Sequence, residues 1–173
     1  MVVGRPFLGV EQIQKKVKEL ADQISDDYEG KNLIAVGILK GAFIFFSDIV
    51  RAIRIPLVVD FLIASSYLKS NTSGEVKMHY DIREEITGKD VLLIEDIVDT
   101  GITLNYLRER ILMKGPKSLK ICTFLDKNER REVDVPLDYV GFQIPNEFVV
   151  GYGLDFDNKF RNLPYISIFK KTA

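Results

Sequence analysis

Apolar residues recur along this chain in two alternating patterns. Between residues 10 and 24 they stand three or four positions apart, which places them along one face of a helix. The same helical spacing returns at residues 43–53 and 104–112. Short, almost wholly apolar runs lie at residues 33–39, 57–63, 91–94, 121–125 and 139–142. Because strands that are buried on both faces have this composition, the pattern predicts a parallel sheet.

Strands that alternate with helices predict an α/β fold, with a mainly parallel twisted sheet flanked by helices. Ligands of such sheets bind beyond the carboxyl ends of the strands, so the residues that follow each strand are the first candidates for a functional site. The segment Ser65–Lys77 departs from the pattern because it is polar and contains Ser, Thr, Asn and Gly. We expect it to form a long exposed loop of the kind that serves as a lid or a binding loop.

Composition and charge restrict the setting of the protein and its partners. The 173 residues suffice for one domain with a substantial core. The 24 Lys and Arg residues nearly balance the 25 Asp and Glu residues, so no global field favours a polyanion, and we expect no nucleic-acid partner. No apolar run approaches the ~20 residues that span a bilayer, and the start of the chain lacks a signal-peptide pattern. We therefore expect no membrane association.

Cys122 and His79 are the only residues of their kinds in the sequence. A single cysteine excludes an internal disulfide, and a single histidine leaves too few soft ligands for a structural zinc site. These features are typical of a reducing, cytoplasmic location. We expect Cys122 to have a structural role and assign no catalytic role to His79.

The strongest candidate site is the segment Glu95–Thr103, with the sequence EDIVDTGIT. Two adjacent carboxylates and a third at Asp99 follow an apolar strand, and Thr100 and Gly101 stand at the start of a helix. A helix start offers unpaired N–H groups and the positive end of the helix dipole, and glycine allows a tight turn, so the segment predicts a cradle for a phosphate monoester. The adjacent acids suit sugar hydroxyls or the water shell of Mg²⁺. Helix capping alone does not explain three carboxylates in this place.

The stretch IEDIVDTGITL resembles the phosphoribosyl-diphosphate-binding signature of the type I phosphoribosyltransferases, and among these the chain resembles the hypoxanthine-guanine phosphoribosyltransferases. The further motifs that carry this resemblance are Leu39-Lys40-Gly41, Ser66-Tyr67, Lys127 and the stretch FVVGYGLDFDNKFR from Phe148 to Arg161. The resemblance covers nearly the whole chain. It implies the type I phosphoribosyltransferase fold in a single domain, residues 1–173. The core would span about residues 30–145, and the N-terminal segment and about residues 146–173 would form a small hood.

The resemblance assigns roles to the residues of the strongest motif. Those implied to bind the phosphoribosyl group are Glu95, Asp96, Asp99, Thr100, Gly101, Ile102 and Thr103. The implied cofactor is Mg²⁺, with Glu95 and Asp96 at one ion and Asp155 at a second. Asp99 is the implied catalytic residue, which accepts a hydrogen bond or proton from N7 of a purine and so makes N9 the better nucleophile. A free aspartate has a pKa of ~3.9 and is ionised at neutral pH, ready to accept.

The other motifs would bind the diphosphate and the base. Those implied to bind diphosphate are Leu39, Lys40, Gly41 and Arg161, with a cis peptide between the first two. Lys127 would contact the six-position oxygen of the purine, Phe148 would stack on the ring, and the backbone of Val149 and Asp155 would face its two-position edge. Because a lysine donates and cannot accept, Lys127 favours a 6-oxo purine over adenine. Ser66 and Tyr67 would belong to the lid.

The resemblance therefore implies a purine-salvage transferase. It would move the 5-phosphoribosyl group from phosphoribosyl diphosphate to N9 of hypoxanthine or guanine, giving IMP or GMP and diphosphate. Three alternatives stay open: an RNA-binding regulatory protein on the same fold, a phosphoribosyltransferase for xanthine or another base, and a protein that binds a magnesium nucleotide without catalysis.

Two positions depart from the family pattern, and one observation bears on assembly. Ile102 follows Gly101 where some members carry a basic residue, and Leu68 stands where Gly is frequent. The family implies a homodimer or homotetramer. Three phenylalanines, Phe43, Phe45 and Phe46, crowd one predicted helix and would suit an interface, although a helix packed on a sheet has the same composition.

Overall fold

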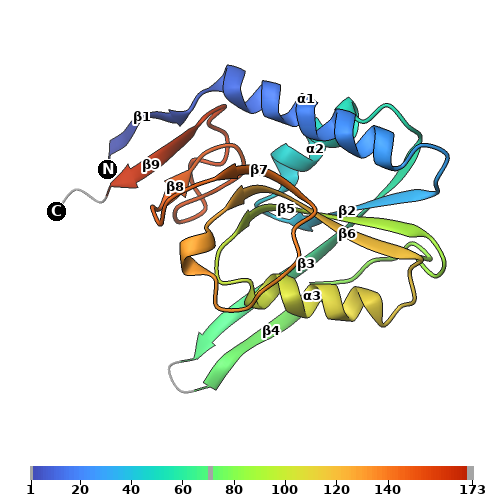
Figure 1. The fold of residues 1–173 in the computed structure, drawn as a ribbon. Coiled ribbons are helices and arrows are strands. Elements are labelled where there is room, and N and C mark those ends of the chain that lie inside the picture. The colour runs from blue at the N-terminus through green and yellow to red at the C-terminus, as the bar shows by residue number, and fades with distance from the viewer. Residues whose placement is uncertain (1, 70–71, 171–173) are drawn as a thin grey trace.

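The main sheet has six strands and is parallel except at one edge. The computed structural model describes the backbone of residues 2–69 and 72–170, and the side chains of residues 5–65 and 76–170 (Figure 1). The strands lie in the order β4-β3-β2-β5-β6-β7, and only the β3–β4 pair is antiparallel. Their bounds are β2 (Leu33–Leu39), β3 (Leu57–Lys69), β4 (Thr72–Tyr80), β5 (Asp90–Val98), β6 (Ser118–Asp126) and β7 (Tyr139–Gln143). The predicted α/β fold with a mainly parallel sheet is confirmed.

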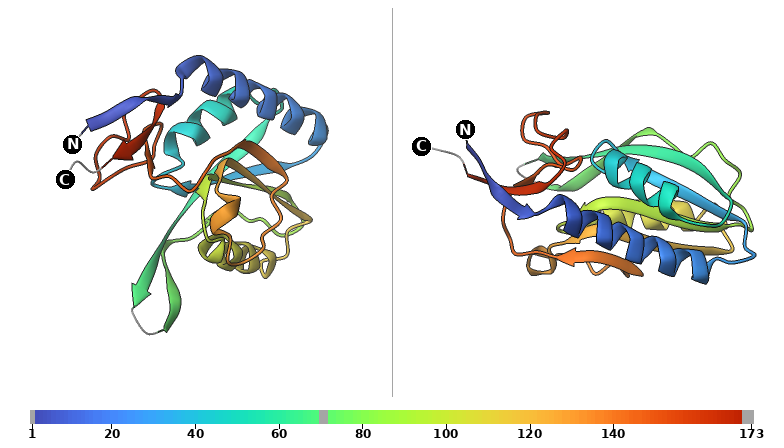
Figure 2. Two further views of the ribbon diagram at one scale, coloured as in Figure 1. Left: turned by 60° about the vertical axis from the view of Figure 1, so that its left-hand side comes forward. Right: turned by 90° about the horizontal axis from the view of Figure 1, so that it is seen from above.

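Helices cover both faces of this sheet, as the apolar stripes predict. Helices α1 (Val10–Asp27) and α2 (Phe43–Ala52) lie together on one face, and α3 (Ile102–Leu112) lies on the other (Figures 1 and 2). The short 3₁₀ helix η1 (Asn128–Arg130) follows β6. Buried apolar residues form two clusters, one on each side of the sheet. No helix in residues 2–69 and 72–170 is long and apolar enough to cross a bilayer.

A second, smaller sheet joins the two ends of the chain. It contains β1 (Val2–Leu8), β9 (Ile166–Lys170) and β8 (Val149–Val150), and β9 pairs antiparallel with both neighbours. The N-terminal and C-terminal segments therefore lie side by side (Figure 1). The sheet stands beside the carboxyl ends of β2 and β5, where the chemistry of the sequence is concentrated.

The prediction of a long loop at Ser65–Lys77 is wrong. β3 continues to Lys69 and pairs with β4 as a hairpin that projects from the body (Figure 1). Its backbone hydrogen bonds are made within the hairpin, so the polar segment needs no buried apolar face to become a strand, and the hydrophobic pattern gives no signal. The backbone of Ser66 and Tyr67 belongs to β3, whereas their side chains lie outside the described residues.

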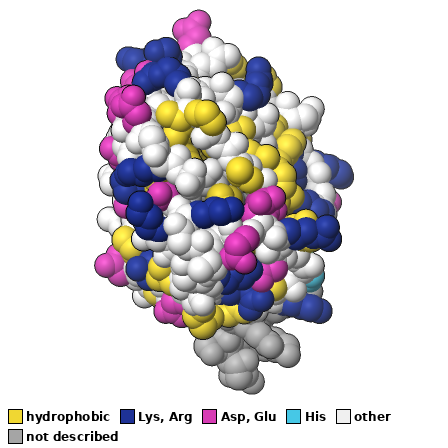
Figure 3. All heavy atoms as spheres, turned by 90° about the vertical axis from the view of Figure 1, so that its right-hand side faces the viewer, with side chains coloured by type: hydrophobic (Ala, Val, Ile, Leu, Met, Phe, Trp, Pro, Cys, Tyr) yellow, Lys and Arg dark blue, Asp and Glu magenta, His cyan; other side chains and the backbone are white. Residues whose placement is uncertain are grey.

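The surface charge agrees with the balanced composition. On the face that lies opposite the small sheet, Lys and Arg side chains are interspersed with Asp and Glu (Figure 3). A surface with interspersed charges produces little net field at a distance. This arrangement on the visible face matches the formal net charge of −1.

The phenylalanines of α2 serve the core more than an interface. Phe45 is fully buried with its ring 4.8 Å from that of Phe124 on β6, and Phe46 packs 5.0 Å from Phe61 on β3. Phe43 is 43% exposed. Of the two interpretations that the sequence left open, packing of the helix on the sheet therefore holds for Phe45 and Phe46, because they attach α2 to the sheet.

Replacing Phe45 with Ala should remove this attachment. The loss of buried ring contacts and the cavity left behind should lower the free energy of unfolding by about 3–5 kcal/mol, measured by urea denaturation. Phe43→Ala on the same helix is the matched control and should cost less than about 1 kcal/mol. Equal losses in the two variants would contradict the packing described for α2.

Candidate active site

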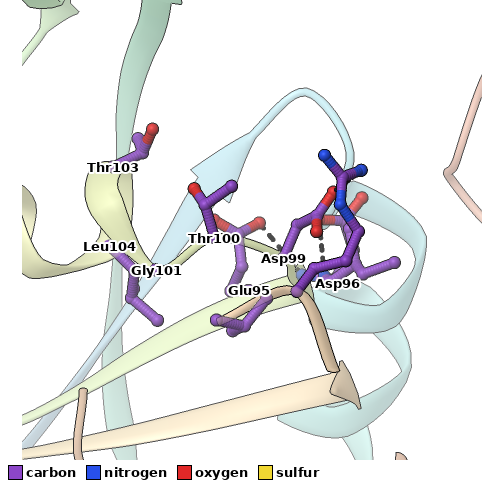
Figure 4. Close-up of a pocket in the computed structure, with 10 residues that line it drawn as sticks. Glu95, Asp96, Asp99, Thr100, Gly101, Thr103 and Leu104 are labelled. Atoms are coloured by element: carbon purple, nitrogen blue, oxygen red, sulfur yellow. Dashed lines mark hydrogen bonds and ion pairs between the residues drawn. The ribbon is translucent and has the colours of Figure 1, made fainter. Parts of the chain in front are cut away.

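A continuous cleft lies at the carboxyl ends of the parallel strands. Two adjoining cavities of 440 and 420 Å³ share residues of β5, among them Glu95, Asp96 and Asp99. The first cavity extends to the turn at residues 99–104, and the second extends to Phe148 and Val149 at the small sheet. Figure 4 shows the acids and threonines of the first cavity around one opening. The cleft is where α/β sheets bind ligands.

Glu95 and Asp96 occupy the end of β5, and the prediction that they follow the strand is wrong. The strand continues to Val98 because its backbone stays paired with β6, from Glu95 opposite Thr123 to Val98 opposite Asp126. One oxygen of each acid already accepts a backbone hydrogen bond. Asp96 N donates to Glu95 Oε1 at 3.0 Å, and Ile97 N donates to Asp96 Oδ1 at 2.8 Å. These bonds fix the two carboxylates at the cleft.

Burial disfavours two ionised carboxylates so close together. Desolvation raises the pKa of Glu95 well above its usual value, and the neighbouring charge of Asp96 raises it further. Desolvation also raises the pKa of Asp96, although a hydrogen bond with Glu95 and the positive charge of Arg161 act in the opposite direction. Ionisation of both carboxyl groups is therefore unfavourable when no cation is bound, and the pair is a favourable site for a cation.

The loop after β2 lies directly against this acid pair. Gly41 is so close to Asp96 that a Cβ atom at position 41 would lie 1.9 Å from Asp96 Oδ2, so any side chain there would displace the carboxylate. The peptide between Leu39 and Lys40 is cis, as the resemblance implied. Leu39 and Gly41 line the cleft, whereas the Lys40 side chain is exposed. Close packing between neighbouring strands thus brings the loop and the acids together.

The turn between β5 and α3 has the geometry of an anion site. Gly101 is the N-cap of α3 and has φ +83°, a conformation that glycine adopts readily. The first helical hydrogen bond runs from Asn105 N to Gly101 O at 2.9 Å, which leaves the preceding N–H groups without helical acceptors. Thr100 and Thr103 line the cleft beside them, as does Gly101 (Figure 4). Ile102 does not line either cavity.

Asp99 holds one oxygen in an ion pair and leaves the other without a donor. Its Oδ2 accepts from Arg130 Nη1 at 2.9 Å. Its Oδ1 is buried and has no hydrogen-bond partner among the described residues. A buried acceptor without a donor is costly, so this oxygen is suited to receive a hydrogen bond from a ligand.

Lys127 and Phe148 face the second cavity. Lys127 is only 6% exposed, and within the described part of the chain its ammonium makes no hydrogen bond or ion pair. Desolvation lowers its pKa, and the nearby charge of Asp99 partly offsets this effect. Phe148 is 51% exposed, which is unusual for a large aromatic side chain, while Val149 beside it is buried in β8. A cavity lined by an unpaired ammonium and a half-exposed aromatic ring suits a flat ligand with an acceptor oxygen.

Asp155 and Arg161 lie at the same cleft and pair with each other. Arg161 Nη2 is 2.7 Å from Asp155 Oδ1, and Arg161 Nη1 donates to Gly153 O at 2.7 Å. Asp155 Oδ2 accepts from Asn158 N at 2.8 Å. The simple ion pair that these two residues can form is thus present in the structure.

The remaining singled-out residues lie away from this chemistry. Cys122 is fully buried in β6, and burial raises the pKa of its thiol, so a nucleophilic thiolate is disfavoured. His79 Nε2 is 2.8 Å from Ser65 Oγ on the neighbouring strand of the hairpin. Neither side chain lines the cleft.

Comparison with known proteins identifies the family. The model of the phosphoribosyl transferase domain matches residues 9–157. The chain belongs to this family.

Its relatives and structural neighbours have consistent names. The hypoxanthine phosphoribosyltransferase of Salmonella typhimurium is 49% identical over 158 residues, covering 90% of this chain and 89% of the relative. The hypoxanthine-guanine phosphoribosyltransferase of Bacillus subtilis is 45% identical over 169 residues, covering 97% of this chain and 94% of the relative. A crystal structure of a hypoxanthine-guanine phosphoribosyltransferase from Bacillus anthracis matches with a TM-score of 0.94 and 48% identity, covering 98% of this chain and all of that chain.

The sequence analysis did not single out the loop after β6, which holds the turn between β5 and α3 in place. Arg131 pairs with buried Asp126 and donates through Nε to the carbonyl of Asp99 at 3.2 Å. The backbone N–H groups of residues 132 and 133 both donate to Thr100 O. Arg130 lines both cavities. Arg130 and Arg131 follow a strand that the sequence predicts to be buried. Because parallel strands end at one edge of the sheet, these two arginines could have indicated that the loop lies at the site.

The donor set fits Mg²⁺ shared with a ligand better than a metal held by protein alone. No group of three or more Asp, Glu, His or Cys side chains in the described ranges is arranged to hold an ion by itself. Glu95 and Asp96 nevertheless offer hard carboxylate oxygens at the end of β5 (Figure 4). Mg²⁺ commonly binds one or two carboxylates and completes its shell with water and phosphate oxygens.

Glu95→Gln should stabilise the protein at neutral pH when divalent cations are absent. A carboxyl whose pKa is raised by folding contributes stability below its unfolded pKa, and that stability is lost as pH rises through the folded pKa. The variant should therefore have the higher Tm at about pH 7.5 and a similar Tm near pH 4.5, measured by calorimetry in EDTA.

The exposed Glu132→Gln variant is the control and should show no such crossover. A lower Tm for Glu95→Gln at neutral pH would contradict the assignment of an unfavourable acid pair.

Proposed function

We propose that the chain transfers the 5-phosphoribosyl group from phosphoribosyl diphosphate to N9 of hypoxanthine or guanine. The observation that carries this proposal is that the largely buried Lys127, whose ammonium is unpaired among the described residues, lines the same cavity as the half-exposed ring of Phe148, in the same cleft as the phosphate cradle. The names of the relatives point to the same substrates. They favour this interpretation over an RNA-binding regulator.

The sugar phosphate would bind across the first cavity. Its 5-phosphate would accept hydrogen bonds from the N–H groups at the start of α3 and from Thr100 and Thr103. The ribose would then lie over Glu95 and Asp96. As the bond from C1 to the diphosphate breaks, positive charge develops on the ribose ring, and the carboxylates are placed to stabilise it.

Glu95 and Asp96 would hold one Mg²⁺ ion together with oxygens of the substrate, and Asp155 would hold a second one in the same way. When bound, the cation would neutralise diphosphate charge and make diphosphate a better leaving group. Gly41 and the backbone around the Leu39–Lys40 peptide would contact the diphosphate, and Arg161 would join them if it leaves Asp155. The guanidinium fork suits paired phosphate oxygens.

Asp99 would act on the base. Its unpartnered Oδ1 would accept the N7 hydrogen of the purine, which increases electron density at N9 as the N9–C1 bond forms. Lys127 would donate to the six-position oxygen, and Phe148 would stack on the ring. Adenine presents an amino donor at that position, so the same lysine would disfavour it.

The β3–β4 hairpin would supply the lid. Ala64, at its base, lines the second cavity, so the hairpin begins at the site. In this proposal the part of β3 with Ser66 and Tyr67 would cover the bound sugar and exclude water, which would otherwise hydrolyse it. Assembly as a homodimer or homotetramer stays a prediction.

Product formation from separate bases tests the proposal. Purified protein would be incubated with phosphoribosyl diphosphate, Mg²⁺ and one of hypoxanthine, guanine, xanthine, adenine or uracil, and nucleotide and diphosphate would be quantified. We expect turnover with hypoxanthine or guanine and at least about 100-fold less with adenine. Preferred use of adenine or uracil, or no diphosphate release with any base, would overturn the proposal.

Asp99→Asn should lower kcat by about 10²–10⁴-fold without raising KM for phosphoribosyl diphosphate, because the amide keeps the shape but is a weaker acceptor. Steady-state kinetics with hypoxanthine would measure both parameters. Asp134→Asn, on an exposed residue outside the cleft, is the control. Equal turnover in Asp99→Asn and the unaltered protein would exclude the base role.

A further inference from the structure

The phosphate end of the cleft has an unfavourable charge balance. Three carboxylates line the first cavity, those of Glu95, Asp96 and Asp99, and Arg130 is the single Lys or Arg residue among the described ones that lines it. Lys127 and the other cleft arginine line only the second cavity. A phosphate monoester carries nearly two negative charges at neutral pH. Acidic side chains disfavour such a group, whereas the helix N–H groups and the threonine hydroxyls that would bind it carry no net charge.

The helix that forms the cradle brings no cation of its own. Ile102 is the first residue of α3, and neither it nor its neighbours in the first turn is basic. The cation at this end therefore comes from a different segment, the 3₁₀ helix η1 after β6.

The backbone of Arg130 is fixed while its side chain is accessible. Its N–H donates to the carbonyl of Lys127 at 3.0 Å, and Lys127 N in turn donates to Val98 O at 2.9 Å. The next residue, Arg131, is held by Asp126. The Arg130 side chain remains 45% exposed, and its ion pair with Asp99 is also partly exposed. Exposed ion pairs contribute little to stability, so this one can be exchanged for a stronger partner at small cost.

We propose that Arg130 is the cationic side chain of the sugar-phosphate site, and that it exchanges Asp99 for the 5-phosphate when the sugar phosphate binds. This inference rests on the proposed function, since it assigns the ligand of the first cavity. An arginine–phosphate pair is charge-assisted and can be bidentate, which makes it stronger than the single bond to Asp99 Oδ2.

The exchange links occupation of the phosphate site to the reactivity of Asp99. In the structure Asp99 Oδ2 is engaged by Arg130 and only Oδ1 is free. Once Arg130 turns to the phosphate, both oxygens of Asp99 can accept from the base. The base would therefore meet a competent Asp99 only after the sugar phosphate is in place.

Binding of two anions separates this role from a structural one. Ribose 5-phosphate carries the phosphate in question, whereas inorganic diphosphate would occupy the other end of the cleft. The affinities would be measured by calorimetric titration in the presence of Mg²⁺. Arg130→Gln should weaken the binding of ribose 5-phosphate roughly 10- to 100-fold and leave the affinity for diphosphate within about twofold of that of the unaltered protein. Arg130→Lys should recover part of the loss. In kinetics, KM for phosphoribosyl diphosphate should rise while KM for hypoxanthine is unchanged.

Arg51→Gln is the matched control for the loss of a charge. Arg51 is an exposed arginine that lies near an aspartate, Asp48, at 3.7 Å, and it lines neither cavity of the cleft. Both affinities should be unchanged in this variant. Since the Arg130 side chain is partly exposed, all variants should keep the Tm of the unaltered protein, which calorimetry checks.

The competition between Asp99 and the phosphate is tested by a double-mutant cycle. Asp99→Asn should tighten the binding of ribose 5-phosphate several-fold, because it releases Arg130. The same substitution should have a smaller effect on this affinity in the Arg130→Gln background. Equal tightening in both backgrounds would indicate simple charge repulsion and overturn the exchange. Unchanged ribose 5-phosphate binding in Arg130→Gln, with phosphoribosyl transfer intact in the unaltered protein, would overturn the inference and leave the proposed function standing. Absence of any transfer or sugar-phosphate binding in the unaltered protein would overturn both.

Discussion

The close approach of Gly41 to the carboxylate of Asp96 is the constraint on which the rest of the active site depends. β2 and β5 are hydrogen-bonded neighbours, so their carboxyl ends lie one strand spacing apart. The loop after β2 can follow that path only because no side chain at position 41 competes with Asp96 Oδ2 for space. This contact fixes the distance between the backbone proposed to bind diphosphate and the acids proposed to face the ribose.

A second consequence of this packing is a concentration of negative charge in a desolvated place. Glu95 and Asp96 are held by backbone N–H donors and cannot separate, and burial raises the pKa of both. The cations that face them come from other segments: Arg130 and Lys127 after β6, and Arg161 near the C-terminus. The free protein thus carries an electrostatic arrangement that a divalent cation and an anionic substrate would relieve. Such local instability is common where binding has to be strong.

Much of the fold could be predicted because it rests on local patterns. The stripe at residues 10–24 and the apolar run Leu33–Leu39 gave a helix and a strand that the structure confirms. The hairpin of β3 and β4 could not be predicted, because its polar segments are held by backbone pairing, which leaves no apolar alternation in the sequence. For the same reason β5 continues past its apolar run to Val98.

The sequence by itself determined the chemistry available at the turn after β5. A strand, acids, threonines, a glycine and a helix start follow one another within a few residues, so short-range geometry is sufficient to form a phosphate cradle. Only the tertiary structure decided which distant groups complete it. It joins Arg130 to Asp99 and brings Lys127 to the same cavity as Phe148. These contacts depend on the order of strands in the sheet and on the path of the chain between them, and no periodicity in the sequence encodes either.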